Sequence, residues 1–269
     1  MTLSGDNTYS TATTVSEGIL QLTGDAVKAN SSIEIANGAT LEYNVPTSEK
    51  SLDFTTSNTT ISGGNVSKTG EGKLKIKADG TQFSAGDFTV SNGELDFKGQ
   101  YNGNLIVKNG ATLSPGNSVG DLTVYGNAII ETGATGLFEF SSYNEDPAQQ
   151  SFDRLFIADN GSFVIDSNSI IKLFFEAGDT DAALWAAEGS EYKLVSDEGF
   201  DTSITPTLGN YTGMFDLLSR NDGLWLIGLG AGPIPPGPEP GSGVPEPSTW
   251  ALLMLGAMGL YFIRQKKSR

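Results

Sequence analysis

The chain lacks the side chains that most enzymes use for catalysis. Its 269 residues contain neither histidine nor cysteine, which excludes a Ser-His-Asp triad, a cysteine nucleophile and a thiolate metal site. Acidic residues number 32, and two carboxyl groups about 5–10 Å apart can cleave a glycosidic bond. No spacing singles out one pair among so many acids, and no glycine-rich loop carries the Lys-Ser/Thr of a phosphate site. We therefore expect no catalysis and no cofactor.

Two glycine-containing loops offer oxygen ligands for calcium. They are Asp159-Asn160-Gly161-Ser162 and Asp197-Glu198-Gly199-Phe200-Asp201. Neither has the ligand spacing of an EF-hand, and the glycine-rich nonapeptide that binds calcium in other β-helices is absent. Solvated turns explain these acids more simply, so the sequence predicts no metal site.

Aromatic side chains offer a further kind of site, because their rings can stack on sugars. Trp225 lies in an apolar run, and Phe174-Phe175 alternates into another. Large aromatic side chains dominate protein cores. We expect Trp185, Trp225 and these phenylalanines to pack in the core, with a sugar-stacking row as the alternative.

The C-terminal end has the composition of a membrane-docking tail. A proline-rich hinge, Val244–Thr249, precedes an apolar stretch from Trp250 to Ile263. Fourteen residues make about 21 Å of helix at ~1.5 Å per residue, which is short for a hydrocarbon core of roughly 30 Å. The tail ends in a basic cluster that is expected to stay cytoplasmic: Arg264, Lys266, Lys267 and Arg269.

The order of Pro245-Glu246-Pro247, an apolar run and a basic cluster resembles the PEP-CTERM sorting signal of bacterial proteins. That signal is recognised by exosortase, a membrane protease. The resemblance implies exosortase and the membrane as partners and transient anchoring in the inner membrane through one C-terminal hydrophobic helix. It also implies release at the cell envelope, at the cell surface or outside the cell, and thus an address rather than a reaction.

The charge distribution restricts the partners of the rest of the chain. Four of the sixteen lysines and arginines lie after residue 263, so residues 1–263 carry a formal charge of −20. A surface this acidic repels nucleic acid phosphates and anionic lipids. We expect no nucleic acid partner.

Short β-rich runs alternate with Asn-Gly turns over the first part of the chain. The turns begin at Asn37, Asn92, Asn109 and Asn160, with spacings of 55, 17 and 51 residues. These spacings are close to multiples of 17–18, a plausible length for one coil of a β-solenoid, and a fixed period near 20 is typical of stacked repeats. Asn-Gly between alternating strands is also the best short hairpin signal. The short runs favour a solenoid, and an antiparallel β-sandwich is the alternative.

Three segments carry a second resemblance, to the passenger-associated β-strand repeats of autotransporters. They are Leu3–Leu22, Lys68–Ile76 and Gly110–Val124. The resemblance implies a right-handed parallel β-helix that begins part-way through a repeat. Met1–Gly5 shows neither the basic nor the apolar part of a secretion signal. We therefore expect the chain to be the C-terminal part of a longer protein, with a misplaced start as the alternative.

The sequence divides into four parts. Residues 1–135 carry the solenoid repeats, and residues 136–228 hold longer, more aromatic strands that are expected to form the last coils and a terminal cap. One short helix is expected over Asp181–Ala187. Residues 229–243 form a Pro/Gly-rich linker, which predicts an extended spacer, and residues 244–269 form the sorting signal.

These observations favour an exported, non-enzymatic β-solenoid with a structural or adhesive role in an extracellular polysaccharide matrix. The first alternative is a carbohydrate-binding module on the same scaffold. The second is a polysaccharide-degrading β-helix enzyme.

Overall fold

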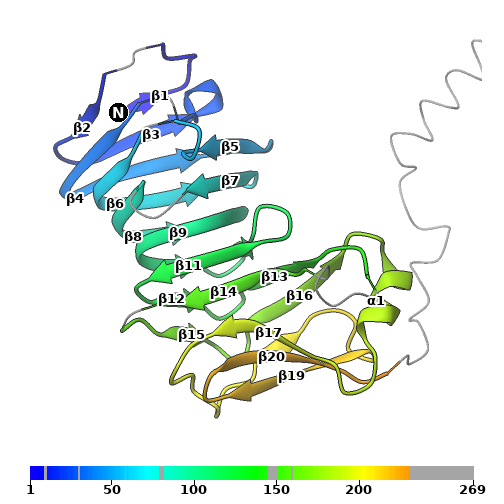
Figure 1. The fold of residues 1–269 in the computed structure, drawn as a ribbon. Coiled ribbons are helices and arrows are strands. Elements are labelled where there is room, and N and C mark those ends of the chain that lie inside the picture. The colour runs from blue at the N-terminus through cyan, green and yellow to red at the C-terminus, as the bar shows by residue number, and fades with distance from the viewer. Residues whose placement is uncertain are drawn as a thin grey trace, which may run out of the picture. The chain divides into compact units, whose positions relative to one another are not determined.

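The computed structural model describes residues 1–8, 11–29, 31–57, 59–78, 82–144, 151–158 and 160–230, which all belong to one compact unit. Strands account for 53% of the residues and helices for 5%, so the all-β prediction is confirmed. The strands form one long sheet of 20 strands. Figure 1 shows the stack running from β1 at one end to β19 and β20 at the other.

Each passage of the chain, here called a coil, contributes strands to three series of parallel pairings. Some strands bend at a corner and belong to two series. The first face contains β2 (Thr13–Val15), the starts of β4 (Ile33–Asn44), β6 (Ile61–Thr69) and β8 (Phe83–Val90), the middle of β9 (Glu94–Val107), and then β11 (Asp121–Tyr125), β14 (Arg154–Ile157) and β17 (Glu191–Ser196).

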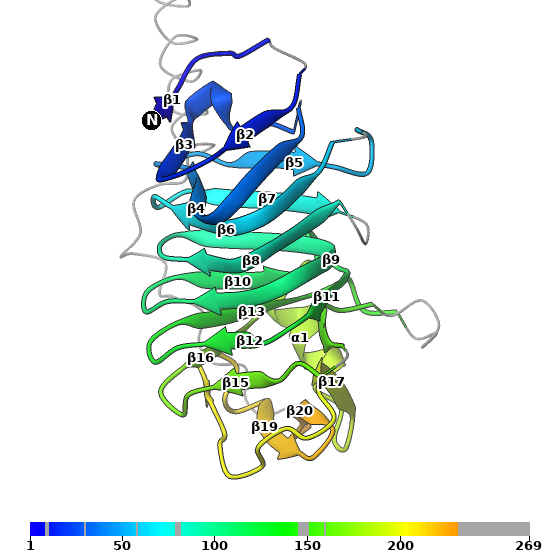
Figure 2. The ribbon, with the colours of Figure 1, turned by 90° about the vertical axis from the view of Figure 1, so that its left-hand side faces the viewer.

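The second and third faces are built in the same way, as Figure 2 shows from the side. The second face contains β1 (Thr2–Leu3), β3 (Ile19–Thr23), the ends of β4, β6, β8 and β9, and then β12 (Ala128–Ile130) and β15 (Phe163–Ile165). The third face contains β5 (Lys50–Asp53), β7 (Lys73–Ala78), the start of β9, β10 (Thr112–Pro115), β13 (Thr135–Phe140), β16 (Ile170–Phe175) and β18 (Thr207–Leu208).

The Asn-Gly turns are corners between faces rather than hairpins. The strands on either side of each turn pair with strands of neighbouring coils, in parallel. Gly38, Gly93 and Gly110 have φ values of +82°, +64° and +80°, a backbone region that glycine enters without steric cost. Asn37 and Asn160 precede the second face, whereas Asn92 and Asn109 precede the third.

The predicted coil length of 17–18 residues holds for only part of the stack. Glu94 lies opposite Thr112, 18 residues later. Elsewhere Ile33 pairs with Ile61, 28 residues later, and Thr135 pairs with Ile170, 35 residues later. The spacing of the Asn-Gly turns misled the prediction because it combined turns from two different corners.

The pairing becomes antiparallel at the C-terminal end of the stack. There β20 (Gly223–Gly228) pairs with β17 and with β19 (Phe215–Arg220). Apart from one isolated bridge between Phe140 and Phe152, these are the antiparallel pairings of the described residues. The sandwich alternative therefore does not describe the stack from β1 to β16, where the pairings between strands are parallel.

Two short helices complete the described chain. The 3-10 helix η1 covers Gly24–Ala26, and α1 covers Asp179–Trp185. Helix α1 begins and ends two residues before the predicted helix. Within the ranges that the structure describes, neither helix is long and apolar enough to cross a bilayer. The linker from residue 231 onward and the apolar stretch Trp250–Ile263 lie outside the described residues.

The interior follows from alternation along the strands. In β13 and β16 every second residue is buried, because successive side chains of a strand point to opposite faces of the sheet. An aromatic cluster fills the middle of the stack around Phe83. Its ring centroid lies 5.5–5.7 Å from those of four other rings: Phe54, Phe88, Phe97 and Tyr101.

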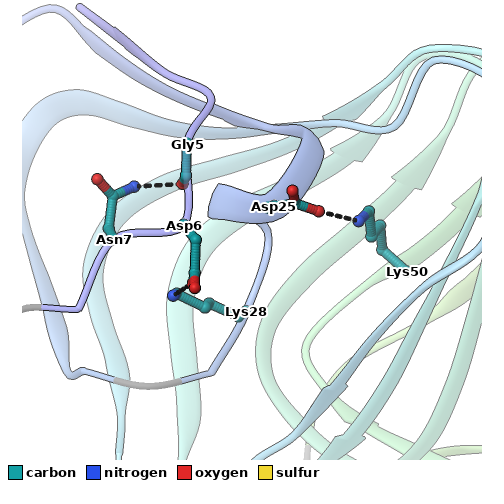
Figure 3. Close-up of polar contacts among 6 residues, drawn as sticks. All are labelled: Gly5, Asp6, Asn7, Asp25, Lys28 and Lys50. Atoms are coloured by element: carbon teal, nitrogen blue, oxygen red, sulfur yellow. Dashed lines mark hydrogen bonds and ion pairs between the residues drawn. The ribbon is translucent and has the colours of Figure 1, made fainter.

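Ion pairs join successive coils on the outside of the stack. In Figure 3, Asp6 contacts Lys28 one coil later, and Asp25 of η1 contacts Lys50 with Nζ and Oδ1 3.3 Å apart. Partly exposed pairs of this kind contribute about 0–1 kcal/mol each. Five more pairs across the parallel faces follow the same pattern: Lys73–Glu94, Lys75–Glu49, Lys77–Asp53, Lys108–Glu131 and Arg154–Asp121.

Phe83→Ala should lower the free energy of unfolding of the full chain by about 3–5 kcal/mol, because it removes a fully buried ring from the aromatic cluster. The matched control is Phe174→Ala, since Phe174 is 51% exposed on β16 and surface substitutions change stability by about 0.5 kcal/mol. Urea unfolding followed by tryptophan fluorescence measures both. Equal losses in the two variants would contradict the placement of this core.

Candidate functional site

The predicted sorting residues all lie outside the described residues. These are Pro245, Glu246 and Pro247, with the basic residues Arg264, Lys266, Lys267 and Arg269. No geometry is assigned to them, and the described residues provide the other candidate sites.

Trp185 lies in the core, as predicted. It ends α1 with 0% of its surface exposed, and its Nε1–H donates to the carbonyl of Ser141 over 3.1 Å. Its ring centroid lies 5.1 Å from that of Phe140 and 5.3 Å from that of Tyr192. Helix α1 is therefore anchored by one aromatic side chain.

The core prediction is wrong for Trp225 and for Phe174, which is 51% exposed, whereas Phe175 is buried as predicted. Trp225 is partly exposed on β20, with Lys193 Nζ 4.8 Å and Arg220 Cζ 4.6 Å from its ring centroid. Its Nε1–H donates to Asp222 over 3.1 Å, and Glu191 pairs with Arg220. Both cations interact favourably with the ring and cover ring surface on which a sugar would have to stack. Trp225 of β20 therefore links β17, which carries Lys193, to β19, which carries Arg220.

The two calcium candidates are resolved only in part. Asp159 lies outside the described residues. Asp197 is buried and accepts the backbone N–H of Phe163 over 2.8 Å, while Asp201 accepts the N–H and hydroxyl of Ser203. No group of three or more acidic residues suited to a metal ion occurs in the part of the chain that the structure describes.

A cationic pocket lies where the third face meets the first. It has a volume of about 490 Å³, and its described lining includes Lys77, Lys98 and Arg154, with one acid, Asp121. We call it the Lys77–Lys98 pocket. Lys77 and Lys98 are directly opposite each other on β7 and β9, so their side chains leave the sheet on the same side.

Three contacts define the charges in the pocket. Arg154 forms a bidentate pair with Asp121, with both N–O distances 2.9 Å. Lys98 Nζ donates to the carbonyl of Val119 over 3.2 Å. Lys77 Nζ lies 3.9 Å from a carboxylate oxygen of Asp53, so its pairing is loose.

Two buried carboxyl groups hold the loop that forms one wall of the pocket. Asp153 accepts the N–H of Gly120 and that of Glu139, each over 2.9 Å. The backbone N–H of Asn117 bonds to Asp96. Both acids are at most 1% exposed, so they fix residues 116–120 from below while the pocket lies outside them.

Burial sets the protonation of these acids. Desolvation raises the pKa of Asp153 to about 9 and that of Asp96 to about 7, because a buried charge loses its hydration. Asp96 Oδ1 also has no hydrogen-bond partner among the described residues. Neither group is placed to reach a substrate, so their shifted pKa values indicate a structural role.

Lys68 is a buried cation inside the stack. Its Nζ donates to the carbonyls of Gly70 and Asn92 over 2.5 and 2.8 Å, and burial lowers its pKa to about 8. The side chain thereby holds the Asn92-Gly93 corner to the coil before it.

Sequence reasoning missed the Lys77–Lys98 pocket, although part of its signal was present. Lys73, Lys75 and Lys77 alternate along one strand, which places all three on the outer side of the sheet. Lys98 and Arg154 lie near Lys77 because of the pairing register between successive coils. Alternation along one strand does not predict that register.

The comparison with known families bears on the C-terminal end. Residues 243–267 match the family model described as the PEP-CTERM protein-sorting motif. This match confirms the predicted sorting signal, which implies processing by exosortase, a membrane protease, and delivery to the cell envelope or surface. Among curated proteins, none matches the chain at a significant level.

Asp96→Asn should flatten the pH dependence of stability. Asp96 has a pKa of about 7 in the folded chain and an ordinary value of 3.8. Between these values the folded chain keeps a proton that the unfolded chain has lost, so this group makes stability fall as pH rises. Urea midpoints at pH 4.5 and 7.5 should therefore differ less in the variant than in the wild type.

Asp201→Asn is the control, because hydrogen bonds from Ser203 lower the pKa of this exposed carboxyl group and move its titration below that range. It should leave the pH dependence between 4.5 and 7.5 unchanged. An Asp96→Asn chain with the wild-type dependence would show that Asp96 titrates normally.

Proposed function

We propose that this chain is an exported, non-enzymatic parallel β-helix with a structural or adhesive role at the cell surface or in an extracellular matrix. The observation that carries the proposal is the match of residues 243–267 to the PEP-CTERM sorting motif. An exported protein with this motif needs a body that survives outside the cell. A stack of parallel coils with a continuous core meets that need.

The pairing of the described strands supports the β-helix part of the proposal. Parallel registers link each coil to the next from Thr2 to Leu208. A right-handed helix is the form implied by the resemblance of Leu3–Leu22, Lys68–Ile76 and Gly110–Val124 to autotransporter passenger repeats. The antiparallel strands β19 and β20, with α1, are suited to cap the last coil.

The chemistry of the described residues supports a role without catalysis. Asp96 and Asp153, whose pKa values are strongly raised, are buried against backbone amides rather than exposed to a polysaccharide. The chain has no histidine to replace them as a general base. A structural or adhesive role requires neither an exposed catalytic carboxyl group nor a general base, so the fold is sufficient for the proposed function.

A carbohydrate-binding module on the same scaffold is the second candidate. Trp225 does not favour it, because Lys193 and Arg220 already lie over its ring. The Lys77–Lys98 pocket does favour it, since it gathers cations on an otherwise acidic chain.

Deletion of residues 244–269 should abolish delivery to the cell surface, because it removes both the sorting motif and the apolar stretch. Replacement of Pro245, Glu246 and Pro247 by alanine should have the same effect while keeping the apolar stretch. Cell fractionation and surface immunolabelling in the native host measure the outcome.

The chain contains its own matched control for this experiment. A second Pro-Glu-Pro sequence, Pro238-Glu239-Pro240, lies outside the matched residues 243–267. Alanine at those three positions should leave surface delivery unchanged. Wild-type surface levels in the Pro245–Pro247 variant and in the deletion would overturn the proposal.

A further inference from the structure

The Lys77–Lys98 pocket has the opposite charge to the chain that carries it. Residues 1–263 contain twelve lysines and arginines against 32 acids, yet three of the twelve line this one pocket, with Asp121 as the single acid among its described lining residues. Most of the other described cations are paired with an acid of a neighbouring strand or coil. Within the pocket, Arg154 is paired with Asp121 and Lys77 only loosely with Asp53. Lys98 has no ion pair among the described residues, so the uncompensated positive charge lies at the two lysines.

Two lysines directly opposite each other are unfavourable in the absence of an anion. Like charges at facing positions of neighbouring strands destabilise a sheet, and Lys77 and Lys98 occupy such positions on β7 and β9. Asp53 offsets Lys77 only loosely, at 3.9 Å. No carboxylate of the described residues lies within 4.0 Å of the Lys98 amine, whose contact is the carbonyl of Val119. Both lysines line the same pocket, so an anion bound there would offset the repulsion between them.

The rest of the pocket is rigid and of mixed polarity. Arg154 is held by both oxygens of Asp121, and Gly120 is held by the buried Asp153. Phe152 and Val119 add apolar surface beside the cations, and the Phe152 ring is stacked on Phe140 with centroids 5.3 Å apart. Because these walls are fixed by contacts of their own, little order is lost when a ligand binds.

We propose that the Lys77–Lys98 pocket binds the carboxylate of an acidic sugar unit, a uronate, in an extracellular polysaccharide. Two lysine amines supply point charges for the carboxylate, and the Phe152 and Val119 side receives the apolar C–H face of the sugar ring. The volume of about 490 Å³ lies in the usual range for small-ligand pockets. The proposed function enters this inference at one point: the extracellular location explains where the chain would meet such a sugar.

Calorimetric titration of the purified, detergent-solubilised full chain with trigalacturonate tests the proposal, with neutral galactotriose as the matched sugar. We expect binding of trigalacturonate that weakens with added salt, and no binding of galactotriose. The double variant Lys77→Gln/Lys98→Gln should weaken trigalacturonate binding by on the order of tenfold or more, since each substitution removes a positive charge that attracts the carboxylate. Because the double variant also removes the repulsion between the facing lysines, a melting temperature no lower than that of the wild type verifies the fold.

Lys172→Gln is the control variant, because Lys172 is an exposed lysine on β16 of the same third face and does not line the pocket. It should bind trigalacturonate like the wild type.

Equal weakening by this variant, unchanged binding by the double variant, or no binding by the wild type at millimolar sugar would overturn the proposal. Binding of inorganic phosphate or sulfate as tight as that of trigalacturonate would overturn the assignment to a sugar. All these readings are independent of surface delivery, so failure of the sorting experiment would leave them unaffected.

Discussion

Parallel backbone hydrogen bonding between one coil and the next is the interaction on which the rest of this structure depends. Thr40 N–H donates to Gly18 over 2.9 Å, Ile33 N–H to Thr60 over 2.8 Å, and Thr135 N–H to Ala111 over 2.9 Å. Because these bonds use only the backbone, each coil supports its neighbour whatever its outward side chains are. Small polar residues can therefore occupy the outer positions, and the inward positions alone must form the core.

The same hydrogen bonding brings successive coils so close together that few residue types fit at the corners. At the corner after the third face, Gly99 has a φ of +113°, and a Cβ there would lie 1.8 Å from the Ala78 carbonyl oxygen of the coil before it. Only glycine allows the two coils to approach this closely. At another corner, the buried Lys68 amine binds two backbone carbonyls. The tight stacking of coils thus explains both the glycine at one corner and the buried cation at the other.

The fold class was predictable from the sequence because alternation reports burial directly. The strands expected within residues 136–228 include β16, and the helix around Trp185 was predicted to within two residues. The coil lengths were not predictable, since Asn37 and Asn92 look alike in sequence but lie at different corners. The prediction that Trp225 is buried failed for a related reason. Its apolar neighbours indicated burial, but the side of β20 on which it lies depends on pairing with β17 and β19. The Lys77–Lys98 pocket required the register between coils for the same reason.

The acidity of the chain and the cationic pocket are compatible because electrostatic interactions in salt are local. At physiological ionic strength the Debye length is about 8 Å, so an anion approaching Lys77 and Lys98 is influenced mainly by charges at that distance. Acids elsewhere on the chain lower the overall affinity for anions without cancelling the pocket. The parallel register is what makes such a local excess possible, because it sets Lys77 opposite Lys98 while Asp121 already occupies Arg154. The cationic pocket on an acidic stack is thus a direct consequence of how its coils are aligned.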